Sequence, residues 1–200
     1  MRILIIGANG TIGNKVASYF SQANEIIIAG RNSGDVFIDI ANPRSITEMF
    51  KNVGSLDAII SIAGEAKWAP FEELTEEDYY VGLKSKLMGQ VNLVRIGKDY
   101  LKPNGSVTLT TGILADHPVR MTTSAAMVNG AIHSFVKAVI LELDHKIRVN
   151  VVCPGLAQDS AEKYKDYFPS HKPVPMDHIV KGYIKSVEGN DSGEIIRIYS

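Results

Sequence analysis

The chain has 200 residues, of which 45% are hydrophobic and 22% are charged, and its formal net charge is −1. These values are typical of a soluble globular protein, so we expect residues 1–200 to form a single domain. The near-neutral charge argues against nucleic acid as a partner. No apolar run is long enough for a membrane span or a secretory signal, so we expect a cytoplasmic protein without membrane contact.

The residue types that bind metals are sparse. Cys153 is the only cysteine, so it forms no internal disulfide and cannot build a thiolate metal site alone. The five histidines are scattered without the spacing of a metal-binding pair. We therefore predict no metal site.

Short apolar runs alternate with helical patterns along the chain. In chain order we expect strand 3–6, helix 11–22, strands 25–29 and 36–39, helix 45–50, strand 58–62, helix 76–100, strand 106–110, helix 122–143, strand 148–152, helix 177–188 and strand 195–198. Several of these strands are apolar on both alternations, as strands covered by helices on both faces must be. The alternation favours a parallel sheet that binds its ligand at the carboxyl ends of the strands.

The first strand runs directly into a glycine-rich loop that opens a helix. Its glycines are spaced GxxGxxG, and they let backbone N–H groups approach a pyrophosphate at the helix N-terminus. The alternative is a turn that only packs the helix on the strand. The expected dinucleotide contacts are Gly7, Asn9, Gly10, Thr11, Ile12 and Gly13.

The second strand ends without the carboxylate that would bind the ribose hydroxyls of NAD. Arg31 and its neighbour Asn32 stand there instead, and a guanidinium suits the additional phosphate of NADP. After the third strand, Asp39 and Ile40 are candidates for contact with adenine. The alternatives are a solvated loop arginine and an Asx turn at Asp39. We predict NADP(H) in preference to NAD(H).

Further motifs follow in a fixed order: Ile62-Ala63-Gly64, Lys86-Leu87-Met88-Gly89, Gly105-Ser106 leading to Thr110-Thr111, and Arg148-Val149-Asn150 leading to Pro154-Gly155. Together with the glycine loop they resemble the short-chain dehydrogenase/reductase family over nearly the whole chain. The resemblance implies an oxidoreductase with a Rossmann-type α/β fold, a doubly wound parallel sheet of about seven strands between helices in three layers. It also implies cofactor contacts at Ala63, Gly64, Pro154 and Gly155.

The residues of the family's catalytic YxxxK motif are missing. An alignment of the following helix places Ala125 at the family's tyrosine and Asn129 at its lysine. Alanine transfers no proton, and a positioned proton donor contributes about 10²–10⁴ in rate. Tyr80 and Lys84 have the motif's spacing but precede the fifth strand, so we interpret them as an exposed helix pair.

Four residues are candidates for a rebuilt catalytic site. Lys86 stands where the family has an asparagine, and Asn129 stands where the family has its catalytic lysine. A cation can therefore enter the site from the helix that carries Lys86. The alternative for Lys86 is a salt bridge. His117, in the loop after the fifth strand, can supply a proton near neutral pH or can simply be solvated. Thr111 matches the family's serine, with Gly112 as the alternative alignment.

The remaining predictions concern the surroundings of this site. Trp68 and Phe71 form an apolar pocket wall or pack within the protein, and residues 156–176 form a compact substrate lid. His133 is interpreted as a packing or interface residue. Because family members associate through their two long helices, we expect a homodimer or homotetramer through residues 76–100 and 122–143.

Two functions remain open at this point. The first is an NADP(H)-dependent oxidoreductase that acts on a small carbonyl or alcohol compound. The second is a catalytically silent NADP(H)-binding or redox-sensing module. A purely structural relic would not need the glycine loop and Arg31, which argue against it.

Overall fold

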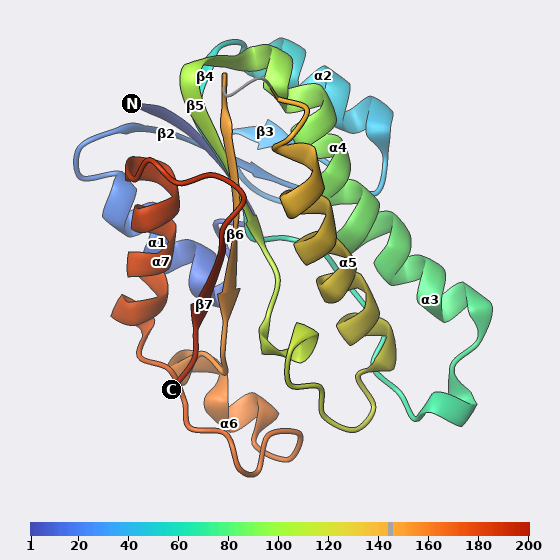
Figure 1. The fold of residues 1–200 in the computed structure, drawn as a ribbon. Helices are drawn as coiled ribbons and strands as arrows, with labels where there is room; N and C mark the ends of the chain where they lie inside the picture. The colour runs from blue at the N-terminus through green and yellow to red at the C-terminus, as the bar shows by residue number, and fades with distance from the viewer. Residues whose placement is uncertain (144–145) are drawn as a thin grey trace.

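The computed structural model describes residues 1–143 and 146–200. Within them, one sheet contains seven parallel strands in the order β3-β2-β1-β4-β5-β6-β7 (Figure 1). The strands are β1 (Arg2–Ile6), β2 (Glu25–Gly30), β3 (Val36–Phe37), β4 (Leu56–Ser61), β5 (Leu101–Thr110), β6 (Arg148–Pro154) and β7 (Ile195–Ile198). The order reverses between β1 and β4, which places a crevice at their carboxyl ends. The predicted α/β Rossmann-type fold is confirmed.

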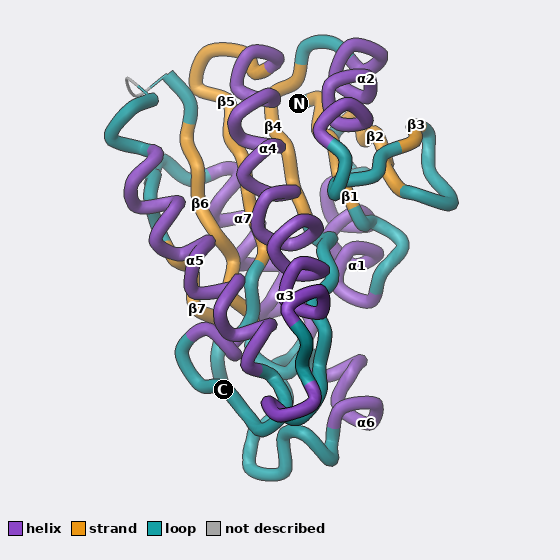
Figure 2. Tube along the Cα trace, turned by 90° about the vertical axis from the view of Figure 1, so that its right-hand side faces the viewer, coloured by secondary structure: helices purple, strands orange, loops and turns teal. Residues whose placement is uncertain are grey.

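Helices cover both faces of the sheet. One face carries α1 (Thr11–Phe20) and α7 (Met176–Glu188), and the other carries α2 (Pro43–Val53), α4 (Met88–Gly97) and α5 (Thr123–Val139) (Figures 1 and 2). The shorter elements are α3 (Glu76–Gly82), α6 (Ala161–Tyr164), the π-helix Leu83–Leu87 and the 3₁₀ turns Phe71–Glu73, Lys98–Tyr100, Ile113–Ala115 and Gln158–Ser160.

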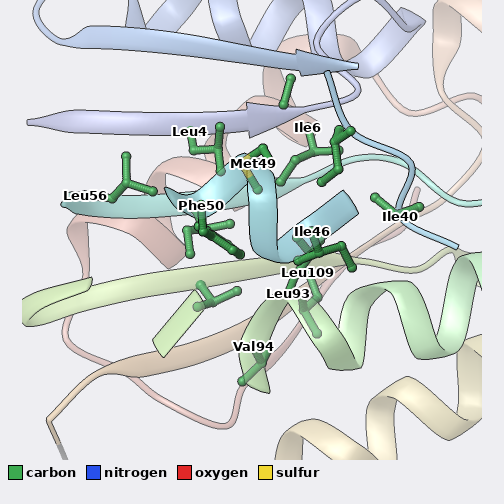
Figure 3. Close-up of a cluster of buried hydrophobic side chains, with 14 of the residues drawn as sticks. Leu4, Ile6, Ile40, Ile46, Met49, Phe50, Leu56, Leu93, Val94 and Leu109 are labelled. Atoms are coloured by element: carbon green, nitrogen blue, oxygen red, sulfur yellow. The ribbon is translucent and has the colours of Figure 1, made fainter. Parts of the chain in front are cut away.

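The core follows from the alternation of side chains along β1. Ile3 and Ile5 are buried among residues of α1 and α7, whereas Leu4 and Ile6 face the opposite layer. Figure 3 shows Leu4 and Ile6 in the same cluster as Phe50 of α2. Each fully buried side chain of this size contributes about 1.5–3 kcal/mol relative to exposure. Burial on both sides therefore fixes the central strand that carries the glycine loop.

The expected continuous helix over residues 76–100 is interrupted. A capping box between Thr75 and Asp78 starts α3, but residues Leu83–Leu87 form a π-helix before α4 begins. A π-turn inserts one extra residue and rotates the side chains after it, and such turns occur often at functional sites. This π-helix contains Lys86.

Several element boundaries also differ from the sequence-based expectation. The strand expected over 36–39 is only two residues long, because the Asp39 carboxylate accepts a hydrogen bond from the Ala41 N–H at 3.0 Å and turns the chain. The Asx turn considered for Asp39 is therefore present. The helix expected over 45–50 begins earlier, at Pro43, where the Asn42 side chain caps it. The helix expected over 122–143 ends at Val139.

Candidate active site

The glycine loop forms a tight cradle at the carboxyl end of β1. Gly7 has φ +86°, a conformation that favours glycine. A Cβ added to Gly13 would lie 2.1 Å from the carbonyl oxygen of Gly7, so the start of α1 packs directly on the loop. Gly10 caps α1 without a side-chain hydrogen bond, and the first turn contains no acidic residue. Thr11 and Ile12 belong to this turn, which offers backbone N–H groups to an anion.

A pocket of about 240 Å³ adjoins this loop. Among the residues predicted to bind the cofactor, those that line it are Gly7, Asn9, Gly10, Arg31, Asn32, Ile40, Ala63 and Gly64. Asp39 does not line it, because its carboxylate is used in the turn at Ala41. The side chain of Asn9 donates to Ser33 Oγ at 2.7 Å and ties the first loop to the second.

Arg31 lies at the rim of this pocket and forms an ion pair with Glu65. Both side chains are more than half exposed, so the pair is weak and exchangeable. The guanidinium remains available to a phosphate that competes with the carboxylate. Glu65 has no counterpart among the sequence predictions, because only the fold brings the loop after β4 against the loop after β2.

A second cavity, of about 590 Å³, shares Gly64 and Glu65 with the first pocket. Of the predicted residues, Ile12, Trp68, Lys86, Thr111, Gly112, Ala125, Asn129, Pro154 and Gly155 line it. The two pockets together form one crevice along the carboxyl ends of the central strands, where an elongated ligand can lie. The site predicted from scattered motifs is thus one continuous surface.

Lys86 lines the second cavity, and its stem packs on Gly64, where an added Cβ would meet Lys86 Cδ at 3.2 Å. Among the described residues, no side chain forms a hydrogen bond or ion pair with its ammonium group. The salt bridge considered for Lys86 is therefore wrong within that part of the chain. Burial lowers the pKa of Lys86 from 10.5 to about 8, because desolvation disfavours the charged form.

Asn129 is a second unpartnered group in this cavity. The residue is 5% exposed, and its Oδ1 atom accepts no hydrogen bond within the described chain. A buried acceptor without a donor costs about 1–3 kcal/mol. A ligand with a hydroxyl or N–H group would satisfy it.

Comparison with known proteins now identifies the family. A family model described as enoyl-(acyl carrier protein) reductase matches residues 10–181, which is most of the chain. The chain belongs to the short-chain dehydrogenase/reductase family. Members of this family bind a nicotinamide dinucleotide.

Three relatives illustrate this membership. A crystal structure of a protein from Listeria innocua is 44% identical with a TM-score of 0.97, and the alignment covers 100% of both chains. A small-chain dehydrogenase solved in complex with NADPH is 26% identical with a TM-score of 0.88, covering 100% of this chain and 96% of the other. L-xylulose reductase of Mesocricetus auratus is 26% identical over 94% of this chain and 84% of its own length.

The residues that the sequence aligns with the family's catalytic hydroxyl groups lie on the wall of the second cavity. Ala125, which the sequence alignment places at the tyrosine position, lines the cavity and is 4% exposed. Gly112 also lines it, and an added Cβ there would have no neighbour closer than 3.9 Å, so a side chain at this position would project into open space. Thr111 instead forms a hydrogen bond with His133 Nε2 at 2.9 Å.

His133, for which the sequence favours a packing or interface role, has a specific partner in the structure. The side chain is buried and contacts the Thr111 hydroxyl. Burial lowers the pKa of His133, because desolvation disfavours the charged form of the ring. Its position in a helix gives no signal of this contact, which depends on how α5 packs on the end of β5.

His117 does not belong to the cavity. The side chain is exposed, and its ring packs edge-on against Tyr199 with centroids 5.8 Å apart. The neighbouring Asp116 is held by Arg197 at 2.6 Å, and this contact lowers the pKa of Asp116 to about 2. The loop is therefore anchored to β7 and away from the cavity, which corrects the prediction that His117 supplies a proton there.

The walls of the cavity come largely from segments without a motif. Trp68 lines it and packs against Tyr164 and Phe168, whereas Phe71 is 69% exposed and contributes nothing to it. Tyr164 and Phe168 belong to the segment 156–176 predicted as a lid, and both line the cavity. The segment thus covers one side of the site.

The residues present fit a dinucleotide. The uncapped start of α1 and the close packing of Gly13 leave a cradle for a pyrophosphate, and the orphaned Oδ1 of Asn129 suits a ribose hydroxyl. Within the described chain, no group of three metal-ligating side chains is present, and His145 lies outside the described residues. No helix in residues 1–143 and 146–200 is long and apolar enough to cross a membrane.

Proposed function

We propose that this protein is an NADP(H)-dependent reductase of small carbonyl compounds in which Lys86 replaces the family's tyrosine as the proton donor. The observation that carries the proposal is the unpaired Lys86 side chain in the cavity next to the glycine-loop crevice. Its pKa of about 8 keeps most of the amine protonated at pH 7 and makes it a competent acid, since catalytic groups work best near the operating pH.

The other residues position and shield this step. Asn129 would hold the ribose of the cofactor through its free Oδ1, and Arg31 would hold the additional phosphate of NADP. Trp68 and Phe168 line the substrate side and reduce the contact of a bound substrate with water, which strengthens interactions with the ammonium group. The bound dinucleotide would supply the hydride.

The first experiment is a calorimetric titration with NADPH and NADH. We expect NADPH to bind at least about tenfold more tightly, a difference of about 1.4 kcal/mol. Absence of binding by either nucleotide would overturn the proposal. A screen of carbonyl substrates that follows NADPH oxidation would come next.

Two variants locate the proton donor. Lys86→Met should lose most turnover, whereas Lys84→Met, an exposed lysine on the same π-helix, should retain it. Tyr164 is the tyrosine that lines the cavity within the described chain, so Tyr164→Phe tests the competing donor. Loss of turnover in Tyr164→Phe alone would assign the proton to the lid and refute the role of Lys86.

The second candidate function is a silent NADP(H)-sensing module. The observation in its favour is that Ala125, aligned with the family's tyrosine, has no hydroxyl group, while the hydroxyl group of Thr111 is used in a hydrogen bond with His133. It requires different affinities for NADPH and NADP⁺, because a ligand pair without differential binding shifts no equilibrium. Tight binding with no oxidation of NADPH by any substrate would favour this module.

We further propose that the protein forms a homodimer or homotetramer through α4 and α5 and that it works in the cytoplasm. Met88 on α4 and Met127 on α5 are more than 40% exposed, as expected for apolar residues at an interface. Sedimentation at micromolar concentration tests the association, and a monomer would contradict it.

A further inference from the structure

The second cavity has an unbalanced charge. Besides Lys86, the titratable side chains that line it are Glu65, Lys67 and Tyr164, and the thiol of Cys153 lies near Lys86. Glu65 and Lys67 are exposed at the rim, and Glu65 is paired with Arg31. The inner ammonium therefore has no anion of the protein's own among the described residues. Buried charges are normally paired, so the ligand is the natural source of the counter-charge.

Most of the rest of the wall is apolar, and its uncharged polar side chains include Thr111, Asn129 and Ser160. The large hydrophobic side chains that line the space are Ile12, Trp68, Val81, Ile113, Leu114, Leu156 and Phe168. A ligand that fits this lining has an apolar body and one anionic end. A sugar or other polyhydroxylated molecule would place several of its hydroxyl groups against this apolar part of the wall, where they have no partners.

We propose that the substrate is an α-keto acid with an apolar side chain, whose carboxylate and keto oxygens both accept hydrogen bonds from Lys86. This inference rests on the proposed function. An ammonium group has three donors, and the two oxygens are neighbours in an α-keto acid, so one lysine can serve both. A charge-assisted hydrogen bond to carboxylate is about twice as strong as a neutral one.

The altered family positions are consistent with this substrate. Gly112 and Ala125 line the cavity beside Thr111 and add little volume to its wall. The space released accommodates a carboxylate beside the carbonyl group. The small side chain at Ala125, where the family's proton donor is expected, thus leaves room for the substrate carboxylate. This carboxylate binds the proposed new proton donor, Lys86.

The step balances without a further reactant. The keto carbon receives a hydride from NADPH, which becomes NADP⁺, and the carbon–oxygen double bond becomes a single bond. The keto oxygen takes a proton from the Lys86 ammonium, which solvent later restores. The product is an α-hydroxy acid.

Trp68 provides a direct binding assay, because it is the only tryptophan of the chain and lines the cavity. The probes are α-ketoisocaproate and isobutyl methyl ketone, which share their apolar body and differ in the carboxylate. With NADP⁺ bound, we expect Trp68 fluorescence to report at least about tenfold tighter binding of the keto acid. Lys86→Met should abolish the preference, and Lys84→Met should keep it.

Each outcome has a defined meaning. Equal affinity for the two probes, or a preference that survives Lys86→Met and Lys86→Gln, overturns the inference. If neutral ketones oxidise NADPH without any preference for the acid, the proposed function stands and the substrate class is wrong. If the acid binds through Lys86 but NADPH is not oxidised, the anion site stands and the reductase is refuted. The preference should also fall as the pH rises through the pKa of Lys86.

Discussion

Replacement of Lys86 by methionine should stabilise the protein while it removes the proposed activity. Methionine fills a similar volume and needs no hydrogen-bond partner. No described side chain forms an ion pair with the wild-type amine, since Glu65 at the cavity rim is paired with Arg31, so the charged form of Lys86 costs free energy in the folded state. A residue retained at the expense of stability is expected at a functional site.

The magnitude follows from the pKa. The change from 10.5 to about 8 corresponds to about 3 kcal/mol at about 1.36 kcal/mol per pKa unit. Because the side chain remains in contact with cavity water, we expect about half of this, about 1–2 kcal/mol. For a chain of this size the melting temperature should rise by about 2–8 °C.

The pH dependence has a defined sign. The pKa of Lys86 is lower in the folded state, so the unfolded state binds more protons between about pH 8 and pH 10.5. The stability of the wild type therefore rises with pH across this window. The gain in unfolding free energy of Lys86→Met over the wild type should be largest below pH 8 and should decrease above it.

The assay is urea unfolding of the wild type, Lys86→Met and Lys84→Met at about pH 7 and about pH 9.5. Lys84 is exposed, with its ammonium 5.6 Å from the Tyr80 ring centroid, so its replacement should change stability little at either pH. If Lys86→Met is no more stable than the wild type at pH 7, the amine is not desolvated. The same conclusion would follow if the difference in unfolding free energy between Lys86→Met and the wild type did not decrease from about pH 7 to about pH 9.5.

Three further predictions concern the cofactor crevice and the sheet. Gly13→Ala should abolish NADPH binding in calorimetry and lower the unfolding free energy by about 1–3 kcal/mol, because its Cβ would lie 2.1 Å from Gly7 O. Arg31→Ala should weaken NADPH about tenfold or more and leave NADH unchanged, and equal losses would contradict the phosphate role. Tyr183→Phe breaks the buried 2.9 Å hydrogen bond to Thr110 and should cost about 1–2 kcal/mol in urea unfolding, with unaltered NADPH affinity.

The sheet was predictable because its strands have two buried faces. A run such as residues 3–6 is apolar throughout. When a glycine turn and a helix follow it, few structures other than a buried parallel strand fit this pattern. The ends of strands were less predictable where a side chain accepts a hydrogen bond from a backbone N–H group and turns the chain. At Asp39 the carboxylate bonds to Ala41 N–H, and this local contact ends the pairing of β3 with β2.

The site was predictable in its positions but not in its contacts. The motifs placed Lys86 and Asn129 near one crevice, and the structure brings both to the same cavity. The contact of His133 with Thr111 and the exposure of His117 depend on the packing of α5 and the loop anchored to β7. Neither has a signature within a single segment of sequence.

The π-helix gives a physical reason for the exchange of lysine and asparagine that the sequence alignment with the family predicts at Lys86 and Asn129. In a regular helix the residue at position 86 would keep the register of Gly82, whereas the extra residue in Leu83–Leu87 rotates the side chains of the next turn. Lys86 packs along Gly64, where the positive φ of +126° and the missing Cβ leave room for its stem. The ammonium group of Lys86 therefore reaches the cavity from the π-helix. It does not depend on the tyrosine and lysine that other family members are expected to carry in the helix equivalent to α5. If this geometry matters, Gly64→Ala should displace Lys86 and reduce keto-acid binding about as strongly as Lys86→Met, because the added Cβ would lie 2.9 Å from Lys86 Cα. Unchanged keto-acid binding by Trp68 fluorescence in Gly64→Ala would show that the stem does not depend on this contact.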